Sequence, residues 1–459
     1  MMKQKLYLMG LFVLLINVKS FSQSHDLTLS KAWERAFAGY PGLAEKEALI
    51  QESLYQQKEV VQDFLPQVQG QFQNTYGTFA GTSGGFFPLP SIFNVSGNNT
   101  NTQQPQTTAN AFGSVLFDWK ITEFGRRQKA VQAAEAGVKK AESTLDATRL
   151  ALQAKVSGLY TDILYNESRL NWARDNARRV EEIVALSKTL AEAGIKPGAD
   201  TLLANSAYLQ TVGELNDWTG RYEASKISLT EIVPVPAGQL ELAESRFLET
   251  GPGFLTADSV SMSHPYLNVL ASQVENDRLR QQVAARKAYP SLSVLGGLSS
   301  RGTGINADGT VNNQWSSGFD NQADNYLIGV GLTWNISEAF KSRAETNKIR
   351  SQREASEARF EARSLQLFTS LRAINSRLTE QLTQVVKTGQ AVTQARNAYE
   401  LYLSRYQNGL INLTELLQIQ SLLQQSEKVN IDAYRSFWEQ VIQRSEISGD
   451  FTFLANHFN

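Results

Sequence analysis

The residues in this sequence that could carry out chemistry are few and lie far apart. Cysteine is absent, and the histidines are His25, His264 and His457. Without cysteine, a disulfide, a thiolate metal site, a cysteine nucleophile and a lipidated N-terminus are excluded. The sequence also contains no H-E-x-x-H helix and no phosphate-binding loop. We therefore expect a protein that is not an enzyme and that uses no cofactor or metal.

Polar side chains that could act together lie instead near two glycines at the ends of helical patterns. Asp200 lies six residues after Gly194. Glu415 lies six residues after Gly409, and Tyr406 lies three residues before that glycine. Glycine at such a place ends a helix by adopting a left-handed backbone. A carboxylate after the turn can simply be favoured by the dipole of the next helix, and this interpretation of Glu415 stays open beside a functional one.

The elements that must position these residues come in two copies. Four landmark residues recur in the same order: Pro41 with Pro265, Pro66 with Pro290, Trp119 with Trp334, and Gly194 with Gly409. The proline pairs share an offset of 224 (265 − 41) and the other pairs an offset of 215 (334 − 119), because the first copy has a longer loop. We infer a duplicated unit, at residues 23–232 and 264–445, with an insert at 233–263 and a C-terminal tail at 446–459.

Each unit is predicted to run helix, strand, loop, strand, very long helix and second helix. The predicted strands are at about 67–79, 109–119, 291–302 and 325–336. The predicted long helical hairpins are at about 120–232 and 337–445. The first long helix runs to about residue 193 without proline, so its length would be on the order of 110 Å. A coiled-coil rod would also use such helices, but the intervening strands argue against it.

The predicted strands alternate apolar with polar or small residues. Val68, Phe72 and Tyr76 alternate with glutamine and threonine in the first strand. Strands of about ten residues with one apolar face are typical of a membrane β-barrel, although a soluble sheet with one buried face looks the same. Long polar loops at 80–108 and 299–324 favour the barrel. Four strands cannot close a barrel alone, so the open edges would have to pair with other copies.

The first residues carry the pattern of an export signal. Two lysines precede an apolar run at 6–18 and a small-residue site that ends at Ser22. We therefore expect a secretory signal peptide at 1–22. With 44 basic and 45 acidic residues the net charge is −1, which gives no electrostatic footprint for nucleic acid.

At this point the sequence resembles the TolC family of outer membrane efflux proteins. The opening segment DLTLSKAWERAFAGYPGL resembles the family's leader motif LTLxEAxxxALxxNPxL, and both long helices end in the family's tip pattern. The resemblance covers roughly residues 26–445. It implies a homotrimer in the cell outer membrane, in which four strands per copy form a twelve-stranded β-barrel above a long α-helical tunnel through the periplasm. The expected fold class is thus an α+β membrane channel.

The resemblance also implies roles for residues near the tip. Glu415 stands where family members commonly carry an aspartate of the pore constriction, whereas Gln418 replaces a second acidic residue. A threefold ring of Glu415 would favour cations, only mildly without the second acid. We further expect a hydrogen bond from Tyr406 to Asp200 that helps close the entrance. The turns at Gly194-Ile195 and Gly409-Leu410 are expected to contact the adaptor.

The implied function is that of a passive exit channel in a tripartite efflux or type I secretion system. Its expected partners are a periplasmic adaptor, an inner-membrane pump of the RND or ABC type, and outer membrane lipid. The alternative is an exported coiled-coil structural or adhesion protein without a lumen. The sequence does not distinguish drugs, metal ions and polypeptides as cargo.

Overall fold

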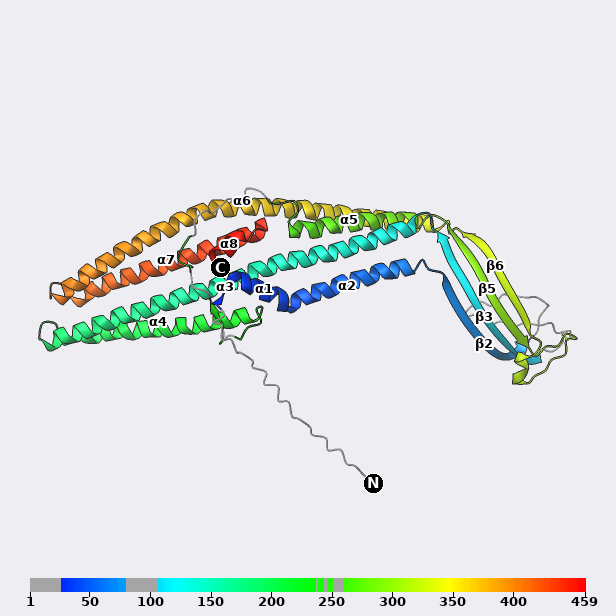
Figure 1. The fold of residues 1–459 in the computed structure, drawn as a ribbon, viewed down its shortest axis with the longest axis horizontal. Coiled ribbons are helices and arrows are strands. Elements are labelled where there is room, and N and C mark those ends of the chain that lie inside the picture. Colours follow the sequence, from blue (N-terminus) through cyan, green and yellow to red (C-terminus); the bar gives the residue numbers. More distant parts are fainter. Residues whose placement is uncertain (1–25, 80–105, 237, 239, 243–245, 251–259) are drawn as a thin grey trace, which may run out of the picture.

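The computed structural model describes residues 26–79, 106–236, 238, 240–242, 246–250 and 260–459. The predicted signal peptide and most of the predicted loop at 80–108 lie outside these residues. The described chain is elongated, with a sheet at one end and two helical hairpins that reach to the other end (Figure 1).

The two hairpins are built from four long helices. They are α3 (Arg126–Glu192) with α4 (Gly198–Thr230), and α6 (Glu338–Gln407) with α7 (Leu413–Ser448). At about 1.5 Å per residue, α3 and α6 are each roughly 100 Å long. Both lie where the helical periodicity predicts them. None of the described helices combines the length and the apolar character that crossing a lipid bilayer requires.

Two shorter helices extend the hairpins toward the sheet. They are α2 (Pro41–Gln62) and α5 (Pro265–Arg286), which pack along α3. Each begins with proline at its first position, where the missing N–H costs no hydrogen bond. After each helix an indole fixes the turn into the sheet: Trp119 donates to the Phe64 carbonyl at 3.3 Å, and Trp334 donates to the Ala288 carbonyl at 3.1 Å.

The sheet has four antiparallel strands in the order β2-β3-β5-β6. They are β2 (Gln67–Phe79), β3 (Gln106–Thr122), β5 (Ser291–Thr303) and β6 (Ala323–Thr333). Strand β6 ends three residues before the predicted residue 336. The pairing partner of β6 is β5, and the last pair between them is Ser291 with Thr333. The residue before Ser291 is Pro290, which has no N–H to donate, so the ladder cannot continue.

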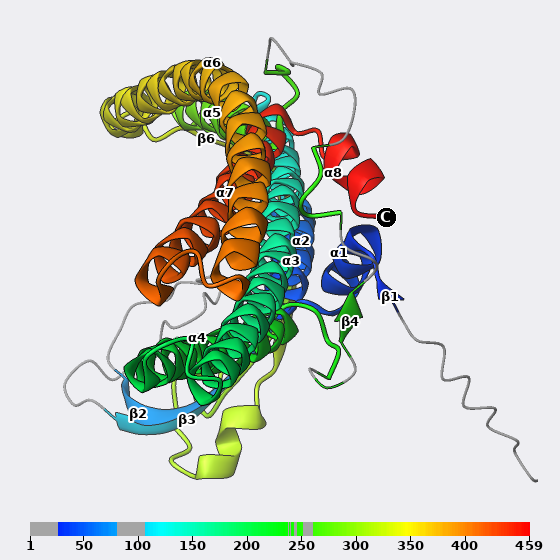
Figure 2. The same cartoon turned by 90° about the vertical axis from the view of Figure 1, so that its left-hand side faces the viewer.

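A compact core lies near the middle of the molecule. Here α1 (Leu29–Gly39), α8 (Thr452–His457) and the parallel pair of β1 (Asp26–Leu27) with β4 (Glu241–Leu242) gather on one side of α3 (Figure 2). Trp438 of α7 is fully buried, and its indole donates to the Phe247 carbonyl at 2.9 Å. His457 of the tail hydrogen-bonds the Arg246 carbonyl at 3.0 Å, so the described part of the insert packs against the tail.

Replacing Trp438 should therefore destabilise this core. We expect Trp438→Ala to lower the free energy of unfolding by about 3–5 kcal/mol, because it leaves a large cavity. Chemical unfolding of the detergent-solubilised protein, followed by circular dichroism, measures the loss. Leu422→Ala is the matched control, since Leu422 lies on the same helix with 52% of its surface exposed. Equal unfolding midpoints for the two variants would contradict the expected core.

Candidate functional site

The strand register gives the sheet one apolar and one polar face. The row Gly70, Val115, Leu298 and Tyr326 runs across all four strands and is largely apolar. The next row, on the opposite face, is Gln71, Ser114, Ser299 and Asn325, and it is entirely polar. Alternation along each strand therefore adds up to two faces of different chemistry.

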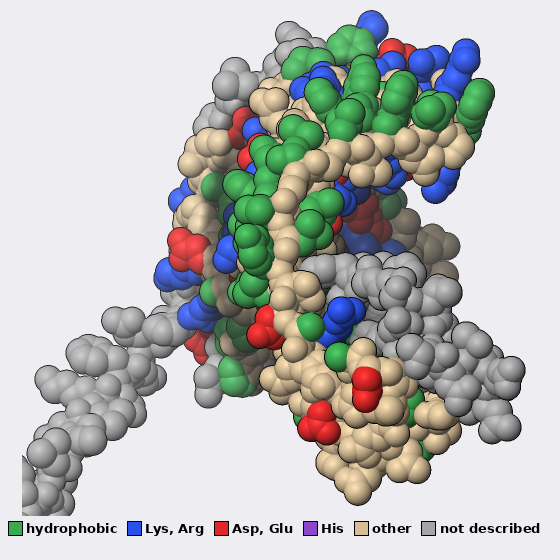
Figure 3. Space-filling model, turned by 90° about the vertical axis from the view of Figure 1, so that its right-hand side faces the viewer, with side chains coloured by type: hydrophobic (Ala, Val, Ile, Leu, Met, Phe, Trp, Pro, Cys, Tyr) green, Lys and Arg blue, Asp and Glu red, His purple; other side chains and the backbone are tan. Residues whose placement is uncertain are grey.

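The apolar face is open over most of its length. Only its end farthest from the helices is covered, by the 3-10 helix η2 (Trp315–Phe319), in which Phe319 stacks on Phe72 with the ring centres 6.4 Å apart. The exposed apolar side chains of this face come from all four strands: Val68, Phe72, Tyr76, Val115, Leu298, Tyr326, Ile328, Val330 and Leu332. Tyr326 and Ile328 expose 81% and 78% of their surfaces. Many hydrophobic side chains are visible at this end of the molecule (Figure 3). A continuous apolar surface of this kind marks contact with lipid or with another protein.

The helical tip is formed by two turns with the same geometry. Gly194 and Gly409 both have φ of +73°, the left-handed conformation that glycine adopts without strain. After each glycine the next amide bonds back across the turn: Ile195 N–H to the Leu190 carbonyl at 2.9 Å, and Leu410 N–H to the Arg405 carbonyl at 2.9 Å. These bonds satisfy carbonyls that the helix end leaves free.

Lys196 joins the two turns. Its ammonium donates to the Gly409 carbonyl at 3.3 Å and to the Ile411 carbonyl at 2.7 Å, and it lies 5.6 Å from the centre of the Tyr406 ring. One cation thus binds both the free carbonyls and the aromatic ring of the other hairpin. Sequence spacing does not point to Lys196, because its acceptors are backbone atoms more than two hundred positions away.

The described chain does not form the predicted hydrogen bond between Tyr406 and Asp200. Tyr406 is fully buried between the hairpins, and the polar side chain within reach of its hydroxyl is that of Ser187. The ring packs in an apolar cluster with Ile183 and Leu416, which turns the hydroxyl away from the surface. Burial raises the pKa of Tyr406, and the charge of nearby Asp200 adds to the rise. The two residues are therefore neighbours, but they form no gate contact in this chain.

Glu415 has a structural role at the start of α7. Asn412 accepts a hydrogen bond from the Glu415 N–H at 2.9 Å, and its own side chain donates to the Glu415 carboxylate at 2.6 Å. This reciprocal pair is a helix-capping arrangement. Glu415 and Gln418 are nevertheless exposed, three residues apart on the helix. Capping and a place in a pore are compatible, so the pore role of both residues stays a prediction.

A buried carboxylate couples the hairpins further from the tip. Glu427 of α7 pairs with Arg179 of α3 at 2.6 Å and with Arg396 of α6 at 3.2 Å. Because the side chains of Glu427 and Arg179 are only 10% and 17% exposed, the ion pair between them is weakly screened by solvent, whereas Arg396 is 57% exposed. This triad is not predictable from the sequence, since its members come from three separate helices. The triad joins the two hairpins at this level.

A scan against family models finds a match to the outer membrane efflux protein family over residues 33–233 and 262–443. The chain is 25% identical over 311 residues to pyoverdine export outer membrane protein OpmQ of Pseudomonas aeruginosa, covering 66% of this chain and 62% of that protein. It is 21% identical over 191 residues to nodulation protein T of Rhizobium leguminosarum bv. viciae, covering 39% of each. The matches span less than two thirds of these relatives.

Solved structures share the fold. The Campylobacter jejuni CmeC outer membrane channel matches with a TM-score of 0.73 at 15% identity, over 92% of this chain and 85% of that one. The outer membrane protein VceC of Vibrio cholerae matches with a TM-score of 0.71 at 14% identity, over 92% and 96%. The outer-membrane channel OprN matches with 0.72 at 16% identity, over 93% and 91%.

Removing the lysine bridge should loosen the tip. We expect Lys196→Met to speed hydrogen exchange of the amides at 409–411 by about tenfold, because charge-assisted hydrogen bonds contribute about 1.5–3 kcal/mol. Lys188→Met is the control, since Lys188 is 66% exposed and lies 4.0 Å from Glu192 of its own helix. Unchanged exchange in Lys196→Met would show that the bridge does not restrain the turns.

Proposed function

Because this chain belongs to the outer membrane efflux protein family and is a protein of the outer membrane, we propose that it forms a passive exit channel of a tripartite efflux or type I secretion system. The observation that carries the proposal is the sheet. It has an exposed apolar face, a polar opposite face and two unpaired edge strands, β2 and β6. Lipid would cover the apolar face, and the polar face would line a wet lumen.

The open edges support a trimer. Edge strands carry unpaired N–H and C=O groups that cannot stay unsatisfied in lipid. Pairing β6 of one copy with β2 of the next satisfies both edges. Three copies of the four-stranded sheet then close a twelve-stranded barrel, and the hairpins below it form the periplasmic tunnel.

The common order of elements supports a duplicated unit. Helix, strand, strand, long helix and helix follow one another in α2-β2-β3-α3-α4 and again in α5-β5-β6-α6-α7. We infer that residues 23–232 and 264–445 are its copies, with 233–263 as an equatorial insert. Three copies with two similar halves each would give the trimer six similar units around its axis, an arrangement that is compatible with a round tunnel.

The tip turns are suited to contact with a partner. Ile195 and Leu410 expose 59% and 70% of their surfaces at the end of the hairpins farthest from the sheet. We propose that they contact a periplasmic adaptor, which links the channel to an inner-membrane pump of the RND or ABC type. The pump supplies the energy, and the channel supplies the path.

The rival proposal is an exported coiled-coil structural or adhesion protein without a lumen. Such a protein could contain similar helices, but it would not require a sheet with one exposed apolar face and one polar face. The two proposals differ in what they require of the sheet, so an electrical measurement separates them.

Reconstitution into planar lipid bilayers tests the channel. We expect discrete single-channel conductance from the full-length protein, and an oligomer band in gel electrophoresis that heating converts to the monomer band. The physical reason is a water-filled lumen within a barrel built from several chains. A protein that stays soluble without detergent and conducts no current would contradict the proposal and support the structural alternative.

Charge at the candidate constriction can be tested in the same bilayers. We expect Glu415→Gln to lower the cation-to-anion permeability ratio severalfold, because a ring of carboxylates favours cations. Glutamine keeps an acceptor for Asn412, so the helix cap survives. Gln418→Glu should change the ratio in the opposite direction. If neither substitution alters the ratio, Glu415 does not lie at the narrowest point.

A further inference from the structure

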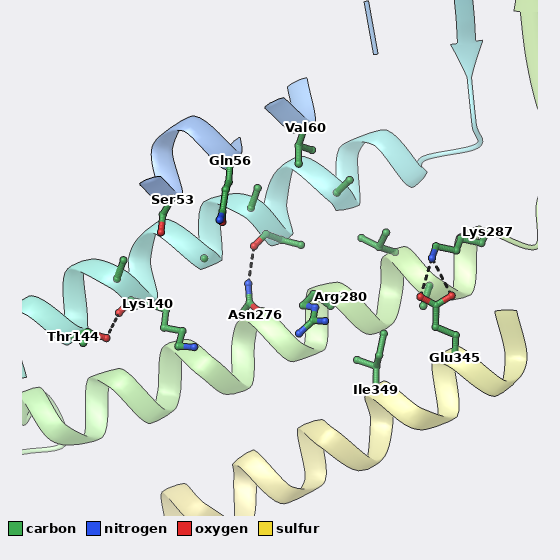
Figure 4. A pocket seen from close by; sticks show the side chains of 17 residues that line it. Ser53, Gln56, Val60, Lys140, Thr144, Asn276, Arg280, Lys287, Glu345 and Ile349 are labelled. Atoms are coloured by element: carbon green, nitrogen blue, oxygen red, sulfur yellow. Dashed lines mark hydrogen bonds and ion pairs between the residues drawn. The ribbon is translucent and has the colours of Figure 1, made fainter. Parts of the chain in front are cut away.

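A cavity of about 570 Å³ lies among α2, α3, α5 and α6, close to the sheet (Figure 4). Side chains from all four helices line it, so it opens on the inner side of the curved layer that these helices form. In the trimer proposed above, this side faces the tunnel. Its volume is in the range of sites that hold small organic molecules.

The floor of the cavity is a smooth apolar strip of α3. Ala130, Ala134, Gly137 and Ala141 recur at spacings of three and four residues and face the cavity. Small side chains at these positions create the hollow, since none extends beyond Cβ. The floor can therefore support a flat or slender apolar body, but it cannot fix a polar group.

The polar groups stand at the walls, and their charge is unbalanced. The charged residues that line the cavity are Lys140, Arg280, Lys287 and Glu345. Lys287 is neutralised by Glu345, whose two oxygens lie 2.8 and 3.0 Å from its ammonium. The remaining cations that line the cavity are Lys140 and Arg280.

Neither remaining cation has a full partner. Arg280 is 53% exposed and lies 3.7 Å from one oxygen of Asp277, while the other oxygen accepts a hydrogen bond from Ser356 at 2.8 Å. Within the part of the chain that the structure describes, the Lys140 ammonium forms no ion pair. The wall thus presents two available cations beside an apolar floor.

The opposite side of the same two helices has balanced charges. A second hollow between α3 and α5 is lined by Lys139 together with Glu142, Asp146 and Glu275. Glu275 is paired with Arg278 at 2.6 Å and Asp146 with Arg149 at 3.8 Å, so this hollow has no excess of positive charge. The two available cations are therefore a feature of the inner cavity and not a general property of these helices.

We propose that the inner cavity is a binding site for soluble organic anions, an inference that rests on the channel function proposed above. The apolar body of the ligand lies over the alanine strip, and its carboxylate or sulfonate lies between Lys140 and Arg280. Charge-assisted hydrogen bonds give such a site its selectivity for anions over cations. Binding there raises the local concentration of anionic cargo within the tunnel.

The proposed binding site can be tested by measuring how well small anions and cations block the channel current. We expect 1-naphthalenesulfonate to reduce the current of the full-length protein in bilayers at lower concentration than 1-naphthylmethylammonium does. Lys140→Gln combined with Arg280→Gln should weaken the sulfonate block by about tenfold, since two charged partners are lost. Lys140→Arg should keep the block, and Lys139→Gln is the matched control on the opposite face. Raising the salt concentration should weaken the block in the parent protein.

The outcomes separate this inference from the proposed function. If conductance is normal but both probes block equally, the proposed binding site is wrong and the channel proposal stands. The same holds if the double variant is blocked as strongly as the parent protein. Absence of any conductance overturns the channel. In that case equilibrium dialysis of 1-naphthalenesulfonate against the solubilised protein decides the site: equal binding by parent and double variant overturns it, and a tenfold loss supports it.

Discussion

The rest of the structure depends on the unpaired edges of its sheet. A backbone hydrogen-bonding group that neither water nor protein satisfies costs several kcal/mol in lipid, so a four-stranded sheet cannot cross a bilayer alone. Strands β2 and β6 are both edges, and the face they border is apolar and exposed. In the proposed channel, partner strands complete the sheet, and their number would then determine the spacing of the helices below it. Because α3 runs without interruption from the sheet to the tip, an arrangement set at the sheet would extend along the hairpins.

Two kinds of contact keep the halves of the chain in register. Near the sheet, β3 pairs with β5 and α3 packs along α5, which joins the first half to the second continuously. Farther down, the hairpins meet through a series of polar contacts: Asp162 with Arg435, Tyr165 with Asp432, the Glu427 triad and, at the tip, the Lys196 bridge. A buried apolar cluster with members from both hairpins packs the tip between these contacts. The two halves are therefore held together along their whole length.

The sequence predicts those features that have a local cause. Helical periodicity predicts α3 and α6, alternation predicts the strands, and Gly194 and Gly409 adopt the left-handed conformation that their places require. Features that depend on distant pairs were not predictable. Lys196 binds carbonyls of the other hairpin, and Arg179 and Glu427 are 248 positions apart. The hydrogen bond expected from Tyr406 to Asp200 is absent for the same reason. The burial of the Tyr406 hydroxyl depends on the residues that pack around it in space, and not on its spacing from Gly409.

Charges of opposite sign border the two ends of the proposed tunnel. Near the tip Glu415 is exposed and Asp200 lies in the first turn of α4, and we propose that both face the tunnel. Cations stand near the sheet, where Lys140 and Arg280 border the apolar strip. A cargo that moves from tip to sheet would meet both signs in turn, and they lie much farther apart than a Debye length of about 8 Å. Each region then acts on the cargo independently. A molecule that carries both a positive and a negative group could be held at both, whereas a single charge would be favoured at one end and disfavoured at the other. Selection of cargo would therefore rest with the pump, and the conduit would set the rate of passage.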